Sequence, residues 1–204
     1  MAKDVIIMGA GGHAKVVADI VLRSGDNLVG FLDDNDAKQG AVVYKDYRVI
    51  GKISDSVDYT DKYFIVAVGD NKTRASTVNN NDLMWYTAIH PNAVVADTTK
   101  IGDGTVVMAG AVINPDTVIG RHCIINTSCS IDHDNKLGDF VHVSPGAHLA
   151  GTVYVGDYSW ICTGASVINN ITVASNVTIG AGATVLEDIT ESGVYVGTPA
   201  ERRN

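Results

Sequence analysis

Every sixth residue between Ile89 and Val185 is isoleucine, valine or leucine, without interruption over seventeen positions. A longer period of eighteen residues is superimposed on it, because an aliphatic residue followed by glycine recurs every eighteen residues from Ile101 to Val155. Three six-residue units in each eighteen residues predict a three-sided coil with one short strand on each side. The sequence therefore predicts a parallel β-helix with the sixth-position aliphatics stacked inside it. Residues four positions later are mostly small, as a narrow interior requires: Thr105, Ala111, Cys123, Ala147, Ser159, Ala165 and Ala183.

The first part of the chain has a different pattern, in which short apolar segments alternate with polar ones. Apolar residues at helical spacing from Ala14 to Val21 predict a helix that Ser24-Gly25 ends, and a polar helix is expected up to about residue 80. The predicted strands, about four in number, are 5–8, 28–32, 63–68 and 83–89. Strands that alternate with helices predict a small Rossmann-like parallel sheet. We therefore expect two domains, 1–88 and 89–204.

A glycine-rich turn joins the first predicted strand to the first helix. Glycines at Gly9, Gly11 and Gly12 permit a tight turn, and free N–H groups at a helix start attract phosphate. Asp33, about twenty residues on, nearly completes a dinucleotide fingerprint. The unit has too few strands for a full dinucleotide fold, so a single nucleotide or nucleotide-sugar suits it better. The loops at 11–13, 33–34 and 69–71 would open at the carboxyl edge of the sheet, although they could also be simple turns.

Composition limits the partners and the compartment that we expect. The net charge is −8, which argues against a nucleic-acid-binding surface. The chain has no apolar run long enough to span a bilayer, and its first residues do not read as a signal peptide. Cys123, Cys129 and Cys162 lack the spacing of metal ligands. We therefore expect a cytoplasmic protein with buried thiols and no metal site.

The charged triplet Asp132-His133-Asp134 interrupts the apolar repeat and is the strongest candidate for chemistry. Gly151 follows His133 by eighteen residues, so it is expected directly beside it on the next coil, about 4.8 Å away. Its N–H could then stabilise an oxyanion. His142 is nine residues from His133, on the opposite side of a three-sided coil. If both histidines line one site, they must come from different subunits, which predicts a closed ring, most simply a homotrimer.

Histidine suits acyl transfer, because a base with a pKa near 6.5 can take a proton from an attacking amine or hydroxyl. A carboxylate beside the imidazole would orient it, and either Asp132 or Asp134 could do so. The remaining histidines of the repeat region are expected to be ordinary solvated surface residues: His90, His122 and His148.

Several motifs together resemble one family along the whole chain. They are the loop ending Gly11-Gly12-His13, Asp33-Asp34 after the second strand, the loop 69–71, the segment from Ile131 through His142 to Gly151, and the hexad end near 196–200. This pattern is similar to the hexapeptide-repeat acyltransferases that include nucleotide-sugar N-acetyltransferases of the bacillosamine and perosamine types and sialic acid O-acetyltransferases.

The resemblance implies a left-handed β-helix and acetyl-CoA as co-substrate, whereas the general rule for parallel crossovers would favour the right hand. It implies that Asp134 orients His133, although the N-acetyltransferase relatives carry glutamate there. The residues implied to line the acetyl-CoA groove are His142, Gly151, Thr163 and Ala181. The residues implied to contact a nucleotide-sugar are Gly11, Gly12, His13, Asp33, Asp34 and Gly69.

The function expected from these features is acetyl-CoA-dependent N-acetylation of a nucleotide-linked sugar, a UDP-4-amino sugar in the first instance, in bacterial surface glycan or glycoprotein biosynthesis. O-acetylation of sialic acid or another sugar is an alternative, because one histidine could activate either acceptor. A non-catalytic scaffold with a nucleotide-sensing domain and a dinucleotide-dependent oxidoreductase also remain open.

Overall fold

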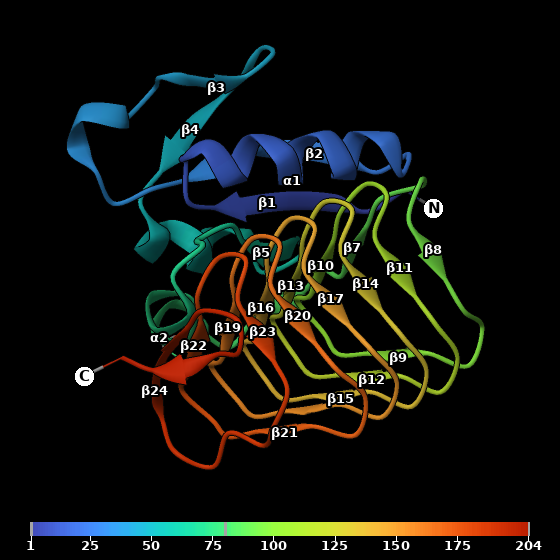
Figure 1. Ribbon diagram of the computed structural model, residues 1–204. Coiled ribbons are helices and arrows are strands. Elements are labelled where there is room, and N and C mark those ends of the chain that lie inside the picture. Colours follow the sequence, from blue (N-terminus) through green and yellow to red (C-terminus); the bar gives the residue numbers. More distant parts are fainter. Residues whose placement is uncertain (1, 80, 204) are drawn as a thin grey trace. The chain divides into compact units, whose positions relative to one another are not determined.

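The computed structural model describes residues 2–79 and 81–203. The chain divides into two compact units, Met1–Pro91 and Asn92–Asn204. The first unit contains a mixed sheet with two α-helices, and the second is a β-helix (Figure 1).

The sheet of the first unit has the strand order β3-β4-β2-β1-β5-β6, in which β3 runs antiparallel to β4 and the other neighbours are parallel. The strands are β1 (Asp4–Met8), β2 (Asn27–Leu32), β3 (Val42–Tyr44), β4 (Tyr47–Gly51), β5 (Tyr63–Val66) and β6 (Met84–Trp85). The helices are α1 (Gly12–Arg23) and α2 (Asn71–Asn79), with the 3-10 turns η1 (Asp36–Lys38) and η2 (Ile53–Tyr59). Ile6, Met8, Leu32, Phe64 and Val66 form a buried core on this sheet.

Helix α1 forms where the apolar spacing predicted it. Ala14, Val17 and Val21 lie on its buried side, and the Ser24 N–H bonds to the Ile20 carbonyl at its end. The Rossmann-like parallel arrangement of β1, β2 and β5 is therefore as expected. This sheet places the chain segments after β1, β2 and β5 at one edge, because the three strands are parallel.

The strand count expected for this unit was wrong. The stretch between 33 and 62 contains a hairpin, β3 and β4, which turns at Lys45 with φ 50°. Its strands are only three and five residues long and mostly exposed or half-buried, so they lack the long apolar run that marks a buried strand. The predicted strand 83–89 is two short strands, β6 and β7 (Ala88–Ile89), of which β6 pairs with β5.

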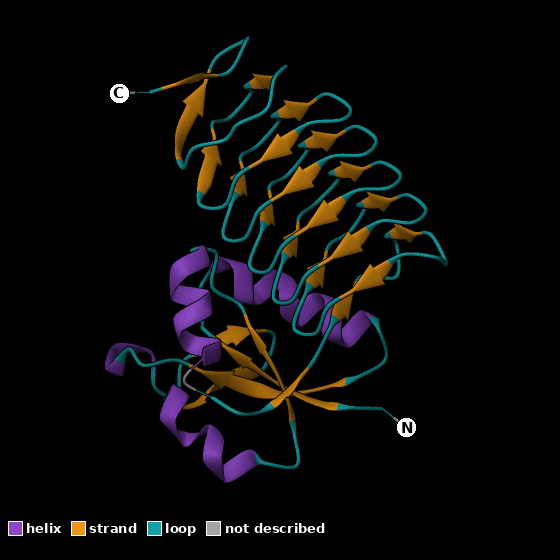
Figure 2. Cartoon of the chain, turned by 90° about the horizontal axis from the view of Figure 1, so that it is seen from below, coloured by secondary structure: helices purple, strands orange, loops and turns teal. Residues whose placement is uncertain are grey.

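The β-helix has three faces, each a ladder of short parallel strands (Figure 2). The first face contains β10 (Val106–Val107), β13 (Ile124–Ile125), β16 (His142–Val143), β19 (Trp160–Ile161), β22 (Val177–Ile179), β24 (Gly193–Val196) and the antiparallel β25 (Glu201–Arg202). The second face contains β8 (Val94–Val95), β11 (Val112–Ile113), β14 (Ser130–Ile131), β17 (His148–Leu149), β20 (Ser166–Val167) and β23 (Thr184–Val185). The third face contains β9 (Lys100–Ile101), β12 (Val118–Ile119), β15 (Lys136–Leu137), β18 (Tyr154–Val155) and β21 (Thr172–Val173).

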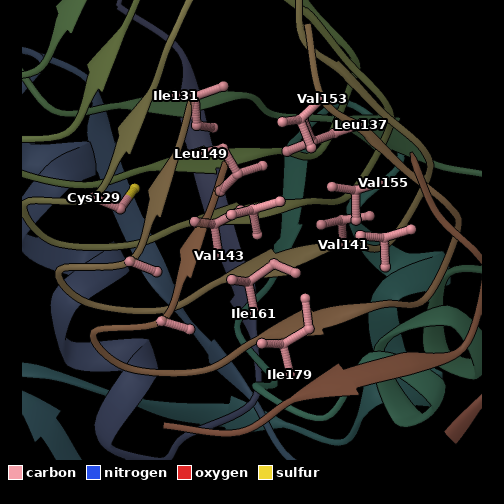
Figure 3. Close-up of a cluster of buried hydrophobic side chains, with 14 of the residues drawn as sticks. Cys129, Ile131, Leu137, Val141, Val143, Leu149, Val153, Val155, Ile161 and Ile179 are labelled. Carbon is pink, nitrogen blue, oxygen red and sulfur yellow. The ribbon is translucent and has the colours of Figure 1, made fainter. Parts of the chain in front are cut away.

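The coil register is the predicted one, because paired residues are eighteen positions apart. Ile131 pairs with Ile113 on one side and with Leu149 on the other. Ile131, Leu149 and Ile161 point into the interior (Figure 3), and the sixth-position aliphatics from Val107 to Val185 are all buried. The first three members of the series are exceptions, because Ile89 is 39% exposed and Val95 and Ile101 are only partly buried.

Candidate active site

His133 lies at the corner of the β-helix between β14 on the second face and β15 on the third face. Its side chain is 57% exposed, and its Nδ1 lies 2.7 Å from Asp134 Oδ2. This hydrogen bond, with the charge of Asp132 adding to it, raises the pKa of His133 above its ordinary value. Asp134 has φ 58°, a left-handed conformation that aspartate tolerates better than most residues. Asp134 therefore contacts Nδ1, and the opposite ring nitrogen, Nε2, has no hydrogen-bond partner among the described residues.

Asp132 has other partners. Its Oδ1 accepts hydrogen bonds from Asn114 Nδ2 and from the His133 backbone N–H, both at 2.8 Å. These bonds hold the pKa of Asp132 below its ordinary value. Of the two aspartates that the sequence left open, Asp134 is the one whose carboxylate contacts the imidazole.

Gly151 lies on the next coil, directly against the His133 ring. A Cβ atom at Gly151 would come within 2.7 Å of both Cε1 and Nε2 of His133. The Thr152 N–H donates to the His133 carbonyl at 2.9 Å, which ties the two corners together. The expected neighbourhood of His133 and Gly151 is thus present, and only glycine leaves room for the ring.

Gly151 also brings a backbone N–H group to the corner of the β-helix where His133 lies. At the equivalent position one coil earlier, the His133 N–H is occupied by the Asp132 carboxylate. Ala150 stands where Asp132 would stand on the Gly151 coil, and it has no acceptor to offer. Within residues 2–79 and 81–203, the Gly151 N–H donates no hydrogen bond. It is available to an oxygen atom bound beside the His133 ring.

His142 lies on another face of the β-helix than the His133 corner, as its spacing of nine residues predicted. It is buried on β16 of the first face, stacks on Trp160 at 5.6 Å between ring centroids, and contacts Asn126 Nδ2 through Nε2 at 3.1 Å. Asn126 Oδ1 accepts the Thr127 N–H, so the amide nitrogen of Asn126 faces His142. This network assigns the proton of neutral His142 to Nδ1. His142 and His133 thus belong to different faces of one chain.

Thr163 and Ala181 are exposed and stack on adjacent coils, since the Gly182 N–H bonds to the Thr163 carbonyl at 2.9 Å. They lie at the corner between the first and second faces, whereas Gly151 lies at the corner between the second and third faces. One chain therefore brings together His133, Asp134 and Gly151, but it separates them from His142, Thr163 and Ala181.

The other histidines correct one expectation. His90 and His122 are buried, and His122 stacks on Phe140, so the view that they are solvated surface residues was wrong. His148 is exposed as expected, with Nδ1 2.8 Å from Ser130 Oγ. A usable signal existed for His122, because aromatic residues recur after it at intervals of eighteen, at Phe140 and Tyr158.

Cys123 and Cys129 are buried thiols as expected, and burial raises the pKa of Cys129 to about 12. Cys162 is only partly buried. No group of three or more histidine, cysteine or acidic side chains suited to a metal ion occurs among the described residues.

The loops of the first unit meet at the carboxyl edge of its sheet. Gly9 has φ 103°, and a Cβ there would lie 3.1 Å from the Ala67 carbonyl oxygen, so the loop after β1 passes tightly beside the end of β5. The Ala10 N–H donates to Asp33 Oδ2 at 2.8 Å, and Lys38 Nζ contacts the same oxygen at 3.0 Å. Asp33 therefore braces the glycine loop.

Gly11, Gly12 and Gly69 are exposed, and no atom lies within 4 Å of an added Cβ at any of them. Helix α1 begins at this opening, and its first turn contains no acidic residue. The start of α1 is therefore uncrowded and free of acidic side chains, two conditions that favour an anion at a helix N-terminus.

His13 and Arg74 lie beneath this edge. The Nε2 of His13 is enclosed and forms no hydrogen bond with the described part of the chain, and burial, with the charge of Arg74 adding to it, lowers the pKa of His13 to about 4. His13 is therefore neutral at physiological pH. Arg74 is buried and donates to the carbonyls of Val68 and Gly69 and to Asn71 Oδ1. Arg74 was not anticipated from the sequence.

Asp34 lines a pocket of about 420 Å³, where its Oδ1 accepts the Ile53 N–H at 2.9 Å. The other residues that line the pocket are Ile53, Ser54, Thr73, Ser76, Thr77 and Asn81. All of them except Ile53 carry a hydroxyl or amide group in the side chain. Asp34 was expected at a ligand site from the sequence, whereas the hydroxyl groups of α2 were not. Their spacing of three and four residues, which puts Thr73, Ser76 and Thr77 on one side of a helix, was the available signal.

Comparisons with known proteins agree with this architecture. Residues 4–80 match the family model of the PglD N-terminal domain, and residues 98–133 match the bacterial transferase hexapeptide model. The acetyltransferase domain of PglB from Neisseria gonorrhoeae, solved in complex with acetyl coenzyme A, is 38% identical, with 100% of both chains covered and a TM-score of 0.92. The chain belongs to the family of hexapeptide-repeat acyltransferases with a PglD N-terminal domain.

Two further proteins that are similar to this chain have names or bound molecules that point to a sugar substrate. PerB from Caulobacter crescentus, solved with CoA and GDP-perosamine, is 34% identical, with 100% of this chain and 99% of that chain covered and a TM-score of 0.90. The UDP-N-acetylbacillosamine N-acetyltransferase of Bacillus subtilis is 38% identical over 114 residues. That match spans 52% of each protein, and a match to an uncharacterised mimivirus protein spans 21% of the latter. None of the described helices is long and apolar enough to cross a membrane.

Proposed function

We propose that this chain is an acetyl-CoA-dependent N-acetyltransferase that acetylates the amino group of a nucleotide-linked sugar. The observation that carries the proposal is the corner where His133 bonds to Asp134 on one side and lies against Gly151 on the other. The relatives support the substrate class, because one is named for acetylation of a UDP-linked amino sugar and another was crystallised with GDP-perosamine and CoA. A UDP-4-amino sugar is the first acceptor to test.

In this mechanism His133 is the general base. With Asp134 accepting from Nδ1–H, the lone pair of the imidazole is on Nε2, one of the two ring atoms nearest Gly151. Nε2 takes a proton from the sugar amine as the nitrogen attacks the thioester carbonyl carbon. Asp134 stabilises the imidazolium that forms, and its effect on the pKa of His133 has the matching direction.

The Gly151 N–H stabilises the negative oxygen of the tetrahedral intermediate. Collapse of the intermediate breaks the carbon–sulfur bond, and the departing CoA thiolate receives the proton held by His133. The products are the acetylated sugar amide and CoA, and the histidine returns to its neutral form. Cys123 and Cys129 take no part, because both thiols are buried in the core.

The nucleotide part of the acceptor binds at the carboxyl edge of the first unit's sheet. Its diphosphate approaches the open start of α1 at Gly11 and Gly12, and its polar rings use the pocket that Asp34 and Thr73 line. Asp33 holds the glycine loop in place through its bond from the Ala10 N–H.

The active enzyme is a homotrimer in which His142 of a neighbouring subunit completes the site. Support comes from the separation of His142 from His133 on different faces of one chain. Mixing His133→Asn and His142→Asn chains under conditions that exchange subunits should restore part of the activity, since some sites then contain both histidines. Restoration would fail if both histidines act within one chain.

A thiol-release assay tests the proposal. Acetyl-CoA is supplied with UDP-linked and GDP-linked amino sugars and with sialic acid, and released CoA is measured with a thiol reagent. His133→Asn should lower kcat by about 10² to 10⁴-fold, the usual contribution of a general base. His148→Asn is the matched control, because it replaces an exposed histidine on the same face by a residue that can still bond Ser130. Equal activity of wild type and His133→Asn would refute the role of His133.

A further inference from the structure

Asn135 follows the catalytic corner and is fully buried inside the β-helix. Its Nδ2 donates to the Asp132 carbonyl at 2.6 Å and to the Ala150 carbonyl at 2.9 Å. Its Oδ1 accepts the Val153 N–H at 3.0 Å, and the His133 carbonyl lies 3.4 Å from Nδ2. One amide group therefore joins the backbone on both sides of His133 to the backbone on both sides of Gly151.

Two other buried polar side chains form a simpler version of this connection. Thr105 Oγ1 donates to the Gly120 carbonyl and accepts the Cys123 N–H. Ser159 Oγ donates to the Ala174 carbonyl and accepts the Val177 N–H. In both, as in Asn135, the acceptor carbonyl is fifteen residues later and the donor N–H eighteen residues later. Bonds of this kind between coils are thus a structural feature of the repeat.

Asn135 differs because its side-chain amide also donates a hydrogen bond to a backbone carbonyl of its own coil. A hydroxyl has one proton, so Thr105 and Ser159 can donate only to the next coil. The second amide proton of Asn135 allows it to donate to the Asp132 carbonyl as well. The same carbonyl also accepts a hydrogen bond from Thr117 Oγ1 on the preceding coil, at 2.8 Å. The backbone that carries His133 is therefore held from inside the β-helix.

We propose that Asn135 is a positioning residue, which sets the separation between the His133 imidazole and the Gly151 N–H. The inference rests on the proposed function, because that separation matters only if both groups act on one acyl group. Asn135 itself is enclosed and touches no substrate. It acts by joining the carbonyls of residues 132 and 150, which immediately precede His133 and Gly151.

Asn135→Val tests this idea with a side chain that the interior already accommodates, since Val153 occupies the same place one coil later and is buried. Asn135→Ser keeps the bonds between coils in the manner of Ser159, but loses the second donor. Ser159→Ala is the matched control, because it removes a connection of the same kind near neither His133 nor Gly151.

We expect both Asn135 variants to lower kcat by about 10 to 100-fold, as a displacement of up to 1 Å does, with the KM for acetyl-CoA within twofold of wild type. Ser159→Ala should keep kcat and lose only thermal stability. Loss of activity in Ser159→Ala equal to that in Asn135→Val would overturn the proposal, because it would make the effect a general one of coil stability.

A second readout does not depend on catalysis. The pKa of His133 can be followed by NMR titration of its ring protons in each variant. Asn135→Val should bring this pKa down toward its ordinary value, because the corner that holds Asp134 against the ring relaxes, and Ser159→Ala should not change it. An unchanged titration in Asn135→Val refutes the positioning role, whether or not an acceptor sugar is found. If Asn135→Val does not fold, Asn135→Ser carries both measurements.

Discussion

Replacement of Gly151 by alanine is the sharpest test of the proposed site. The added Cβ would lie 2.7 Å from Cε1 and Nε2 of His133, and ordinary carbon contacts begin near 3.4 Å. The ring must therefore retreat by roughly 0.7 Å. Gly151 does not have the left-handed φ that would strain an alanine, and the His133 side chain is 57% exposed, so the ring can move outward without unfolding the coil.

The retreat separates the base from the Gly151 N–H and from the atoms between them. A misplacement of 1 Å can cost about 10²-fold in rate, so we expect kcat to fall by about 30 to 100-fold in Gly151→Ala. Steady-state kinetics with the thiol-release assay measures this fall. The overpacked ring should also cost about 1 to 2 kcal/mol of stability, which chemical denaturation measures.

A double-mutant cycle separates crowding of the ring from other effects of the alanine. In a His133→Ala background there is no ring to displace, so Gly151→Ala should then change the free energy of unfolding by less than about 0.5 kcal/mol. If the alanine costs as much stability without the ring as with it, the contact between Gly151 and His133 is not the cause. If Gly151→Ala keeps full kcat, the arrangement of base and oxyanion donor is wrong.

Three further outcomes follow from individual contacts. Asp134→Asn should move the acid limb of the pH–kcat profile to lower pH, because the bond that raises the pKa of His133 loses its charge; an unmoved limb would count against Asp134. Ile131→Ala removes a fully buried ladder residue and should cost about 2 to 5 kcal/mol in denaturant unfolding, whereas a cost under 1 kcal/mol would contradict its place in the core. Asp33→Ala releases the Ala10 N–H and should weaken UDP binding about tenfold by calorimetry, about the value of one charge-assisted hydrogen bond; unchanged affinity would remove Asp33 from the site.

The β-helix could be predicted from the sequence because its interior has a strict period. A six-residue aliphatic ladder has no other simple explanation, and residues such as Ile131 and Leu149 pair at the predicted distance of eighteen. The same period predicted that Gly151 would lie against His133. Handedness could not be derived, because a ladder of side chains has the same period in either hand, so it rested on the resemblance alone.

Other features were harder to predict from the sequence, because they depend on which side chains pair with one another and not on the period alone. Asp132 and Asp134 are equivalent by spacing, and their roles separate through their partners, because Asn114 bonds to Asp132 whereas the His133 ring contacts Asp134. The interval of eighteen between Asn114 and Asp132 was a signal that they would stack. The β3–β4 hairpin and buried Arg74 had no such signal, since half-exposed strands and a lone arginine in a polar helix are not distinctive.

The pairing of each strand with the strand eighteen residues away has a consequence for how such a chain can change its length. Removal of eighteen residues deletes one coil and leaves every remaining ladder in phase, so the fold can shorten in whole coils. The site does not share this freedom. Deletion of residues 134–151 would keep the ladders but bring Asn169 to the place beside His133, where a side chain would fill the space that glycine leaves open. Coils can therefore be deleted at either end of the β-helix, whereas the two adjacent coils that carry His133 and Gly151 must both be kept.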